Sequence, residues 1–261
     1  MGNHQRAWLC GWHAVCETLR VGRWLPTEVR MAIESLDADR AEELQTLTRE
    51  LDIPCHDCSA SELEQLLNRR DHQGCAARMP DFPYSDWEKV LTDLTESESA
   101  CVLVLDRIQD PHNFGAILRS AEIFGAAAVI VPEREQSGVN SQVVRSSAGA
   151  VNHLPLVRMP SLVDAVKQLQ QVRFRAVAGS EKATCAPANE QLTGRIVLVV
   201  GNEGVGPSAD LMECCDSLVA IPQSGQVDSL NVAVAAGILL YEVARQRSDS
   251  TSAQNAAPRS S

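Results

Sequence analysis

The stretch CVLVLDRIQDPHNFGAILRSAEIFG, residues 101–125, combines a short apolar run, a polar loop and an amphipathic segment. The run at 101–105 lacks any alternation of apolar and polar residues, which is typical of a strand buried on both faces of a sheet. From Phe114 to Phe124 the apolar residues recur at the spacing of 3, 4 and 7 that predicts a helix with one buried face. The order of strand, loop and helix indicates an α/β unit.

Arg119 is the residue of this predicted helix that packing does not explain. At 100° per residue it lies about 150° from the centre of the apolar face. A solvated surface arginine is the ordinary interpretation of such a position, so a role in function has to come from the rest of the chain.

Similar apolar runs recur in the second part of the chain and are separated by helical segments, which predicts a parallel sheet covered by helices. These runs are residues 127–131, 174–178, 196–200 and 217–221. Before them, shorter strand and helix patterns fill residues 1–80 and predict a small α/β domain. Prolines, acids and aromatics predict a linker at 81–95, so the parallel-sheet domain spans 96–247, and the polar residues 248–261 are predicted to be disordered.

Composition narrows the class of protein. The chain has 261 residues, 44% of them hydrophobic, and a net charge of −11, which argues against coating nucleic acid by bulk electrostatics. The acidity is concentrated in residues 1–100, where 10 Lys and Arg face 19 Asp and Glu. No apolar run approaches the length of a membrane span and no signal-peptide pattern is present, so a soluble cytoplasmic protein is expected.

Cysteine usage agrees with a reducing compartment, because an odd number of nine cysteines does not suggest a disulfide framework. The sequence CHDC places Cys55 and Cys58 at the spacing of half a zinc site, but no second such pair accompanies it. We therefore expect loop or strand-edge thiols and no metal.

Three polar loops follow predicted strands, at the ends where parallel α/β sheets bind ligands. They read DRIQDPHN (106–113), GNEGVGPS (201–208) and PQSGQVDSLN (222–231). Glycines in the second loop allow a close approach of backbone to a ligand. The order G-x-G-x-x-G is missing and the loop comes late in the chain, so a dinucleotide-dependent oxidoreductase is the weaker interpretation.

The three segments DPHNFGAILRSAEIFGAAAVIV (110–131), IVLVVGNEGVGPS (196–208) and IPQSGQVDSLNVAVAAGILLYE (221–242) together resemble the signature motifs of the SpoU family of S-adenosylmethionine-dependent RNA 2′-O-ribose methyltransferases, within the SPOUT superfamily. GWHAV (11–15) and HQGCAARM (72–79) resemble the N-terminal RNA substrate-binding domain of the RlmB-type ribosomal RNA enzymes of that family. The resemblance implies a methyltransferase domain with a deep trefoil knot, and a homodimer in which each site borrows residues from the partner.

The resemblance also implies residue roles. Gly201, Ile221 and Leu230 are expected to bind S-adenosylmethionine, although Ile221 could simply end a buried strand and Leu230 start a helix core. The expected catalytic and substrate-orienting residues are Asn113, Arg119, Glu203, Ser229 and Asn231, although Asn113 and Ser229 also suit helix N-caps. We expect Arg119 to hold a phosphate and stabilise the developing alkoxide as a charged guanidinium, and leave the proton acceptor open.

The expected substrate is a guanosine of large-subunit ribosomal RNA. A transfer RNA ribose methyltransferase is the close alternative, and a non-catalytic RNA-binding assembly factor of the same fold is a further one. Because the N-terminal domain is acidic, RNA binding there requires a local arginine patch, for which the candidates are Arg20, Arg23, Arg69, Arg70 and Arg78. His13 and His72 are either RNA contacts or buried, hydrogen-bonded histidines.

Overall fold

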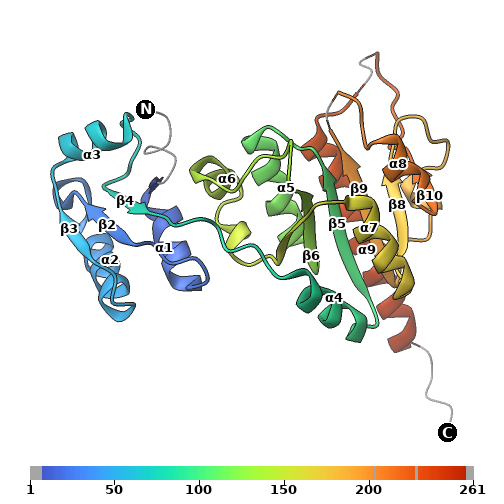
Figure 1. Ribbon diagram of the computed structural model, residues 1–261, viewed down its shortest axis with the longest axis horizontal. Helices are drawn as coiled ribbons and strands as arrows, with labels where there is room; N and C mark the ends of the chain where they lie inside the picture. The colour runs from blue at the N-terminus through green and yellow to red at the C-terminus, as the bar shows by residue number, and fades with distance from the viewer. Residues whose placement is uncertain (1–7, 203, 227–228, 257–261) are drawn as a thin grey trace, which may run out of the picture. The chain divides into compact units, whose positions relative to one another are not determined.

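The chain folds into two compact units. The computed structural model describes residues 8–202, 204–226 and 229–256, the last six of them by backbone alone. Unit 1 comprises residues 1–83 together with 138–153, and unit 2 comprises 84–137 with 154–261. Each unit has its own sheet (Figure 1).

Unit 1 is built on a four-stranded sheet with the order β1-β4-β2-β3. The strands are β1 (Trp8–Cys10), β2 (Glu28–Met31), β3 (Cys55–Asp57) and β4 (Cys75–Arg78), of which only β2 and β3 pair in parallel. Its helices are α1 (Trp12–Val21), α2 (Ala38–Glu50), α3 (Ala60–Leu67) and α6 (Ser141–Ser146), with short 3-10 turns η2 (Ile33–Ser35) and η3 (Ala150–Asn152). The small α/β domain predicted at the start of the chain is confirmed.

The boundaries in unit 1 follow local signals. Ser59 caps α3 and exchanges hydrogen bonds with Glu62 in a capping box. Gly11 joins β1 to α1 with a φ of 102°, a conformation that side chains other than glycine's rarely adopt. Cys55 lies in β3, an edge strand, and burial raises the pKa of its thiol and of the neighbouring Cys58 thiol.

Unit 2 contains a six-stranded sheet in which every neighbouring pair is parallel, in the order β10-β8-β9-β5-β6-β7. The five predicted strands are present as β5 (Ala100–Asp106), β6 (Ala128–Pro132), β8 (Arg175–Gly179), β9 (Arg195–Gly201) and β10 (Ser217–Val219). The sixth, β7 (Leu156–Met159), is an addition to the prediction. The parallel sheet is therefore confirmed, whereas the trefoil knot stays a prediction from the resemblance.

Helices cover both faces of this sheet (Figure 1). On one face, alternate strand residues such as Val102 and Val197 pack with α4 (Trp87–Glu96), α7 (Leu162–Gln171) and α8 (Ala209–Glu213). The other face carries α5 (Pro111–Ile123) and α9 (Val232–Ala256), which pack against each other. The buried side chains of α5 include Phe114, Ile117 and Leu118, so its predicted apolar face is confirmed.

Two predicted segments differ from the structure. The expected linker at 81–95 contains most of α4, because Asp86 caps a helix whose Trp87, Val90 and Leu94 side chains are buried. The expected disordered tail begins inside α9, which continues to Ala256. In its last part the hydroxyl of Ser250 hydrogen-bonds to the carbonyls of Gln246 and Arg247, so polar side chains are accommodated along the helix.

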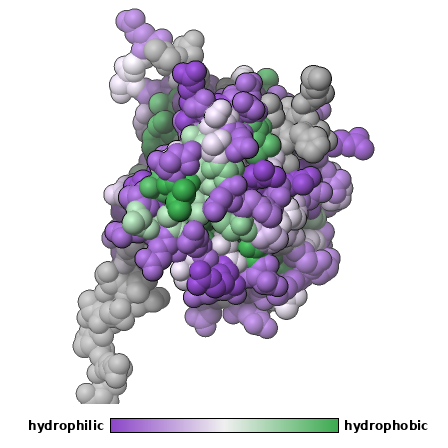
Figure 2. All heavy atoms as spheres, turned by 90° about the vertical axis from the view of Figure 1, so that its left-hand side faces the viewer, coloured by the Kyte–Doolittle hydropathy of each residue, from purple (hydrophilic) through white to green (hydrophobic). Residues whose placement is uncertain are grey.

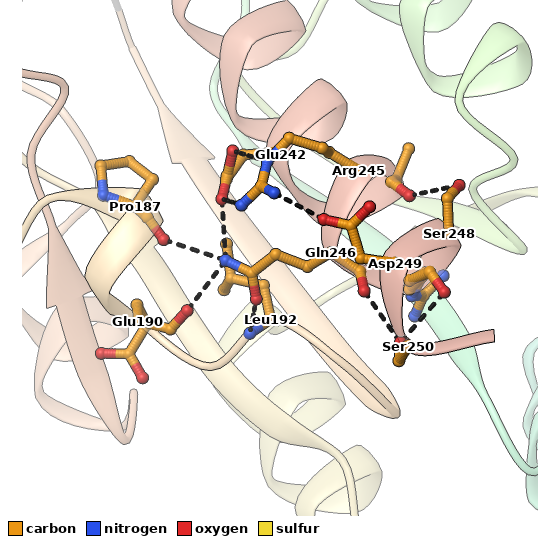
Figure 3. A network of polar contacts seen from close by, with 11 residues as sticks. Pro187, Glu190, Leu192, Glu242, Arg245, Gln246, Ser248, Asp249 and Ser250 are labelled. Carbon is orange, nitrogen blue, oxygen red and sulfur yellow. Dashed lines mark hydrogen bonds and ion pairs between the residues drawn. The ribbon is translucent and has the colours of Figure 1, made fainter. Parts of the chain in front are cut away.

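The side chain of Gln246 fixes the connection between β8 and β9 onto α9 (Figure 3). Its Nε2 donates to the carbonyls of Glu190 at 3.0 Å and Pro187 at 3.3 Å and to the Glu242 carboxylate at 2.8 Å. Its Oε1 accepts from the backbone N–H of Leu192 at 2.9 Å. One side chain thus satisfies the backbone groups that a buried loop would otherwise leave unpaired.

The molecular surface is mainly polar on the face drawn in Figure 2, where hydrophilic residues surround a small hydrophobic area. Large hydrophobic side chains exposed on unit 1 include Leu25 and Ile33. Within the described residues, no helix is both long enough and apolar enough to cross a membrane.

Candidate active site

The three predicted loops all leave the same edge of the parallel sheet. β5 and β9 are neighbours along their whole length, with Asp106 opposite Gly201 at their ends. The loops that follow these two strands therefore start side by side. The loop after β10 emerges at the same edge, separated from β9 by the single strand β8.

Asp106 joins the first two loops. The residue is only 5% exposed, and its carboxylate accepts a hydrogen bond from the backbone N–H of Ser208 at 2.8 Å. It also accepts two hydrogen bonds from the guanidinium of Arg107, which raises the pKa of Arg107 above its ordinary value. Asn202 adds a second connection, since its Nδ2 donates to the Arg107 carbonyl at 3.0 Å. These hydrogen bonds hold the backbones of the first two loops together at the edge of the sheet, and we call this arrangement the frame.

Gly201 occupies a place where no side chain fits. A Cβ built there would lie 1.9 Å from the backbone nitrogen of Pro207 and 2.1 Å from the carbonyl carbon of Gly206. The loop folds back over the end of β9 with a φ of 70° at Gly206, and Gly206 N–H donates to the Asn202 carbonyl at 2.9 Å. The predicted cofactor-binding residue is thus required for the shape of the loop itself.

Asn113 and Asn231 meet although 118 positions separate them. Asn231 Nδ2 donates to Asn113 Oδ1 at 3.0 Å. Asn231 Oδ1 also accepts from the backbone N–H groups of Ala233 and Val234, so Asn231 is the N-cap of α9. Two of the predicted catalytic side chains therefore come together at the start of helices α5 and α9.

The alternative capping roles considered for Asn113 and Ser229 are wrong. Asp110 caps α5 by accepting from the N–H groups of His112 and Asn113, because Pro111 suits the first helical position and shifts the start of the helix upstream. Asn231, not Ser229, caps α9, and Ser229 is exposed in the loop before it. The structure thus gives neither residue a capping role, and Asn113 instead contacts Asn231.

Arg119 lies on the exposed side of α5, as its position on the helix predicts. It forms no ion pair with the residues described in 8–202, 204–226 and 229–250, so its guanidinium is available to a ligand. One turn further along the same face lies Ile123, which is 62% exposed. On α9, Val234, Ile238 and Tyr241 are also exposed apolar side chains.

Ile221 and Leu230 flank the third loop. β10 ends at Val219, so Ile221 does not end a buried strand, and Leu230 is 37% exposed rather than part of a helix core. The backbone groups of both residues have no hydrogen-bond partner among the residues that the structure describes. Their free N–H and C=O groups suit the edge of an adenine, which needs one donor and one acceptor.

The remaining candidates from the sequence are one acidic residue, two histidines and a possible metal site. Glu203, predicted to be catalytic, lies outside the described residues. His72 is 5% exposed and its Nδ1 accepts from Gly74 N–H at 3.1 Å, which supports the structural interpretation. His13 is exposed. Among the residues that the structure describes, no cluster of three or more His, Cys, Asp or Glu suits a metal ion.

The arginines of the predicted RNA patch contact different partners. Arg20 pairs with Glu43, Arg69 with Asp71, Arg70 with Glu64 and Arg78 with Glu28. Arg23 lies over the ring of Phe82. The RNA-binding patch remains a prediction.

Sequence reasoning missed Asp106 and Asn202, which organise the loops without belonging to the expected catalytic set. Asp106 had a signal, because an acidic residue ends an otherwise apolar strand. The loop after β8 was also missed. It leaves the same edge between the loops of β9 and β10, which only the strand order reveals.

The chain matches two family profiles. Residues 100–241 match the SpoU rRNA Methylase family, and residues 8–85 match RNA 2′-O ribose methyltransferase substrate binding. A Staphylococcus aureus protein whose name places it in the TrmH family of tRNA/rRNA methyltransferases is 33% identical over 243 residues, covering 92% of this chain and 96% of the relative.

Solved structures agree with these matches. The SpoU methyltransferase AviRb from Streptomyces viridochromogenes, in complex with the cofactor AdoMet, is 27% identical with a TM-score of 0.78, covering 93% of this chain and 90% of that one. An AdoMet-bound rRNA methyltransferase from Sinorhizobium meliloti is 25% identical with a TM-score of 0.78, covering 91% and 86%. With its loops, its parallel sheet and its N-terminal unit all matched, the chain belongs to the SpoU rRNA methylase family of RNA methyltransferases.

Proposed function

We propose that this enzyme transfers a methyl group from S-adenosylmethionine to the ribose 2′-hydroxyl of a guanosine in large-subunit ribosomal RNA, in the cytoplasm. The observation that carries the proposal is the meeting of Asn113 and Asn231 at 3.0 Å, beside the frame that Asp106 holds between the first two loops. The residues assigned to catalysis by resemblance thus include a contacting pair at the edge where such sheets bind ligands.

The choice of ribosomal RNA rests on the extent of the match. The rRNA methyltransferase from Sinorhizobium meliloti matches 91% of this chain, so the likeness includes unit 1 as well as the methylase part. Transfer RNA is the second candidate, because the name of the Staphylococcus aureus relative includes both RNAs. Ribose-methylation mapping of both RNAs from cells lacking the gene decides between them.

The residues present at the sheet edge fit S-adenosylmethionine. Gly201 keeps the second loop tight against β9, and the free backbone groups of Ile221 and Leu230 suit an adenine. When bound there, S-adenosylmethionine supplies an activated methyl group on a sulfonium centre. The contribution of the protein is then to orient the ribose hydroxyl in line with that methyl group.

The polar side chains divide this work. The hydrogen bond between the amides of Asn113 and Asn231 limits the rotation of both side chains. The second N–H of Asn231 Nδ2 is thereby presented to the ribose at a fixed position. Ser229 is exposed two residues before Asn231 and orients the same substrate. Glu203 completes the proposed set from the second loop.

Arg119 is proposed to contact the RNA and not the methyl donor. A guanidinium remains charged at neutral pH and binds a phosphate through two parallel hydrogen bonds. We assign it to the phosphate next to the target ribose, where its charge also stabilises the oxygen as the hydroxyl proton leaves. Its exposure and its lack of an ion pair within the described chain support this role.

The enzyme is proposed to act as a homodimer through the faces of α5 and α9. The two packed helices carry exposed apolar side chains, namely Ile123, Val234, Ile238 and Tyr241. An apolar surface of this kind is typical of an interface. Arg119 lies one helical turn from Ile123, so a partner seated on this surface would border the site. Sedimentation of the wild type and of Ile123→Asp, expected to be monomeric, tests the dimer.

The test of the function is the replacement of Arg119. Arg119→Ala is expected to fold and bind S-adenosylmethionine normally while methyl transfer to ribosomal RNA falls by roughly 100-fold or more, the scale seen when a stabilising donor is removed. Arg119→Lys should recover part of the rate without a strong change in the pH profile.

Lys167→Ala is the matched control, since Lys167 is an exposed cation on α7, across the sheet from α5. It should leave the rate unchanged. Wild-type turnover by Arg119→Ala would show that Arg119 is a solvated surface residue without a role in the reaction. Saturable NAD binding without binding of S-adenosylhomocysteine would reject the methyltransferase assignment at this site.

A further inference from the structure

Residues 138–153 lie between β6 and β7 in the chain but belong to unit 1. Asn152, which is 2% exposed, donates from Nδ2 to Thr18 Oγ1 of α1 at 3.0 Å. His153 Nε2 lies 2.9 Å from the Glu17 carboxylate. We call residues 138–153 the insertion. The methylase profile covers it at 100–241, whereas the structure places it with the substrate-binding strands and helices.

Glycine permits the close approach of the insertion to α1. Gly149 has a φ of 85°, and a Cβ built on it would lie 2.7 Å from Cγ of Glu17. The insertion thus packs directly on the helix side chains of α1. The insertion is therefore closely packed against α1 as part of unit 1.

A cavity of about 450 Å³ lies between the insertion and α1. Its polar lining comes from three parts of unit 1, namely α1, the segment before β4, and α6, with the residues His13, Glu17, Arg20, Asp71, Gln73 and Arg145. Without the insertion this cavity would lack the wall that carries Arg145, Ala148 and Gly149. The volume is within the range of small-ligand pockets and is large enough for one nucleotide.

The charges in the cavity are unevenly paired. Near Arg145, one carboxylate is shared by two guanidinium groups, because Asp71 accepts hydrogen bonds from Arg69 at 2.6 Å and from Arg145 at 2.9 Å. These hydrogen bonds hold the pKa of Asp71 below its ordinary value. At the other end, Arg20 pairs with both Glu43 and Glu17. The positive excess therefore lies at the Arg145 end.

Arg145 has donors left for a ligand. Only its Nη2 is engaged, by Asp71, and within the described chain Nε and Nη1 have no partner. The side chain is 38% exposed, so a ligand can reach it. Each edge of a guanidinium pairs one Nη2 hydrogen with either Nε–H or Nη1–H, and Asp71 occupies only one of the two Nη2 hydrogens. One edge of Arg145 therefore still matches two oxygens of one phosphate.

We propose that this cavity binds one phosphodiester of the RNA substrate through Arg145, with the attached nucleoside extending along α1. The proposal rests on the proposed function, because it takes RNA as the ligand of unit 1. The match of residues 8–85 to an RNA substrate-binding profile favours RNA over an acidic protein. At the Arg20 end two carboxylates flank one guanidinium, so this end has no excess positive charge for a phosphate. It is assigned to the uncharged sugar and base, beside the exposed imidazole of His13.

The test measures RNA affinity without methyl transfer. Full-length wild type, Arg145→Ala and Arg145→Lys are titrated against deproteinised ribosomal RNA from cells lacking the gene, at several salt concentrations. Arg145→Ala is expected to lose affinity by about 10-fold or more, and the slope of log affinity against log salt should fall by about 0.7–0.9, the value for one phosphate contact. Arg145→Lys should keep the slope and recover part of the affinity.

The matched control is Arg49→Ala, which removes one exposed cation of unit 1 at the end of α2, outside this cavity. It should leave affinity and slope unchanged. Equal losses for Arg49→Ala and Arg145→Ala, or no loss for Arg145→Ala, would overturn the proposal. Because Asp71 keeps Arg69 when Arg145 is removed, Arg145→Ala should melt within a few degrees of the wild type.

Two further measurements separate the possible failures. Calorimetric binding of S-adenosylmethionine reports on the proposed function alone and should be the same for wild type and Arg145→Ala. Inorganic phosphate at millimolar concentration should compete with RNA in the wild type. If phosphate binds in an Arg145-dependent way but RNA affinity does not depend on Arg145, the cavity is a site for a free anion and the proposal is wrong.

Discussion

Replacing Gly201 by alanine is the sharpest perturbation of the sheet-edge loops. The added Cβ would lie 1.9 Å from the backbone nitrogen of Pro207, whereas ordinary Cβ contacts begin near 3.4 Å. The obstacle is backbone, so no side chain can rotate away from it. The loop from 204 to 208 must therefore move by about 1.5 Å, the difference between these two distances.

The energetic consequence follows from the hydrogen bonds on that loop. A shift of this size breaks the bond from Ser208 N–H to Asp106 at 2.8 Å and the bond from Gly206 N–H to Asn202 at 2.9 Å. A neutral hydrogen bond is worth about 1 kcal/mol and one to a charged group about 1.5–3 kcal/mol. The native loop is then disfavoured by about 2–4 kcal/mol, and affinity for S-adenosylmethionine should fall by about 30- to 1,000-fold.

Calorimetry of S-adenosylmethionine binding checks this value at a temperature where circular dichroism shows both proteins folded. Gly237→Ala is the matched control. It makes the same substitution in helix α9, where the Cβ would meet only the Ser120 hydroxyl at an ordinary 3.6 Å, so the affinity should not change. Wild-type affinity in Gly201→Ala would refute the claim that the folded-back loop forms the cofactor site.

Two further outcomes are expected. Asn231→Ala removes the cap of α9 and the contact with Asn113, so unfolding in urea should show a loss of about 1 kcal/mol, while methyl transfer falls by more than that loss explains; an unchanged rate would contradict its role at the site. The pKa of Asp71 is lowered, chiefly by its hydrogen bonds with Arg69, so its contribution to stability is complete above its unfolded pKa of about 4 and is lost as pH falls below that value. The difference in urea midpoint between wild type and Asp71→Asn should therefore shrink from pH 6 to pH 3, and a constant difference would show that the ion pairs do not stabilise the fold.

The sequence predicted most of unit 2 because its strands are buried on both faces. A continuous apolar run such as 101–105 has few other interpretations, and polar residues directly after it indicate a ligand-binding loop. The exposed position of Arg119 followed from helix geometry alone. These features are local, so neighbouring residues are enough to predict them.

The features that sequence reasoning missed depend on distant residues. The contact between Asn113 and Asn231 requires the packing of α5 on α9, which no local pattern encodes. The same holds for the insertion, whose α6 joins unit 1 after more than 50 residues of another unit. The helix cap at Asp110 is different, because the pair Asp-Pro before the helix was a readable local signal.

The docking of the insertion also affects how unit 1 forms during synthesis. Its strands are complete at Arg78, but the wall contributed by Asn152 and His153 leaves the ribosome only after 70 residues beyond Pro83 have been added. At about 5–20 residues per second, this delay is about 4–14 s. During that interval the face of α1 that carries Thr18, which is 1% exposed in the finished fold, remains open to solvent. A nascent chain of this protein therefore completes unit 1 and the β6–β7 strand pair of its parallel sheet at almost the same time. An isolated fragment ending at residue 83 would keep that face of α1 uncovered.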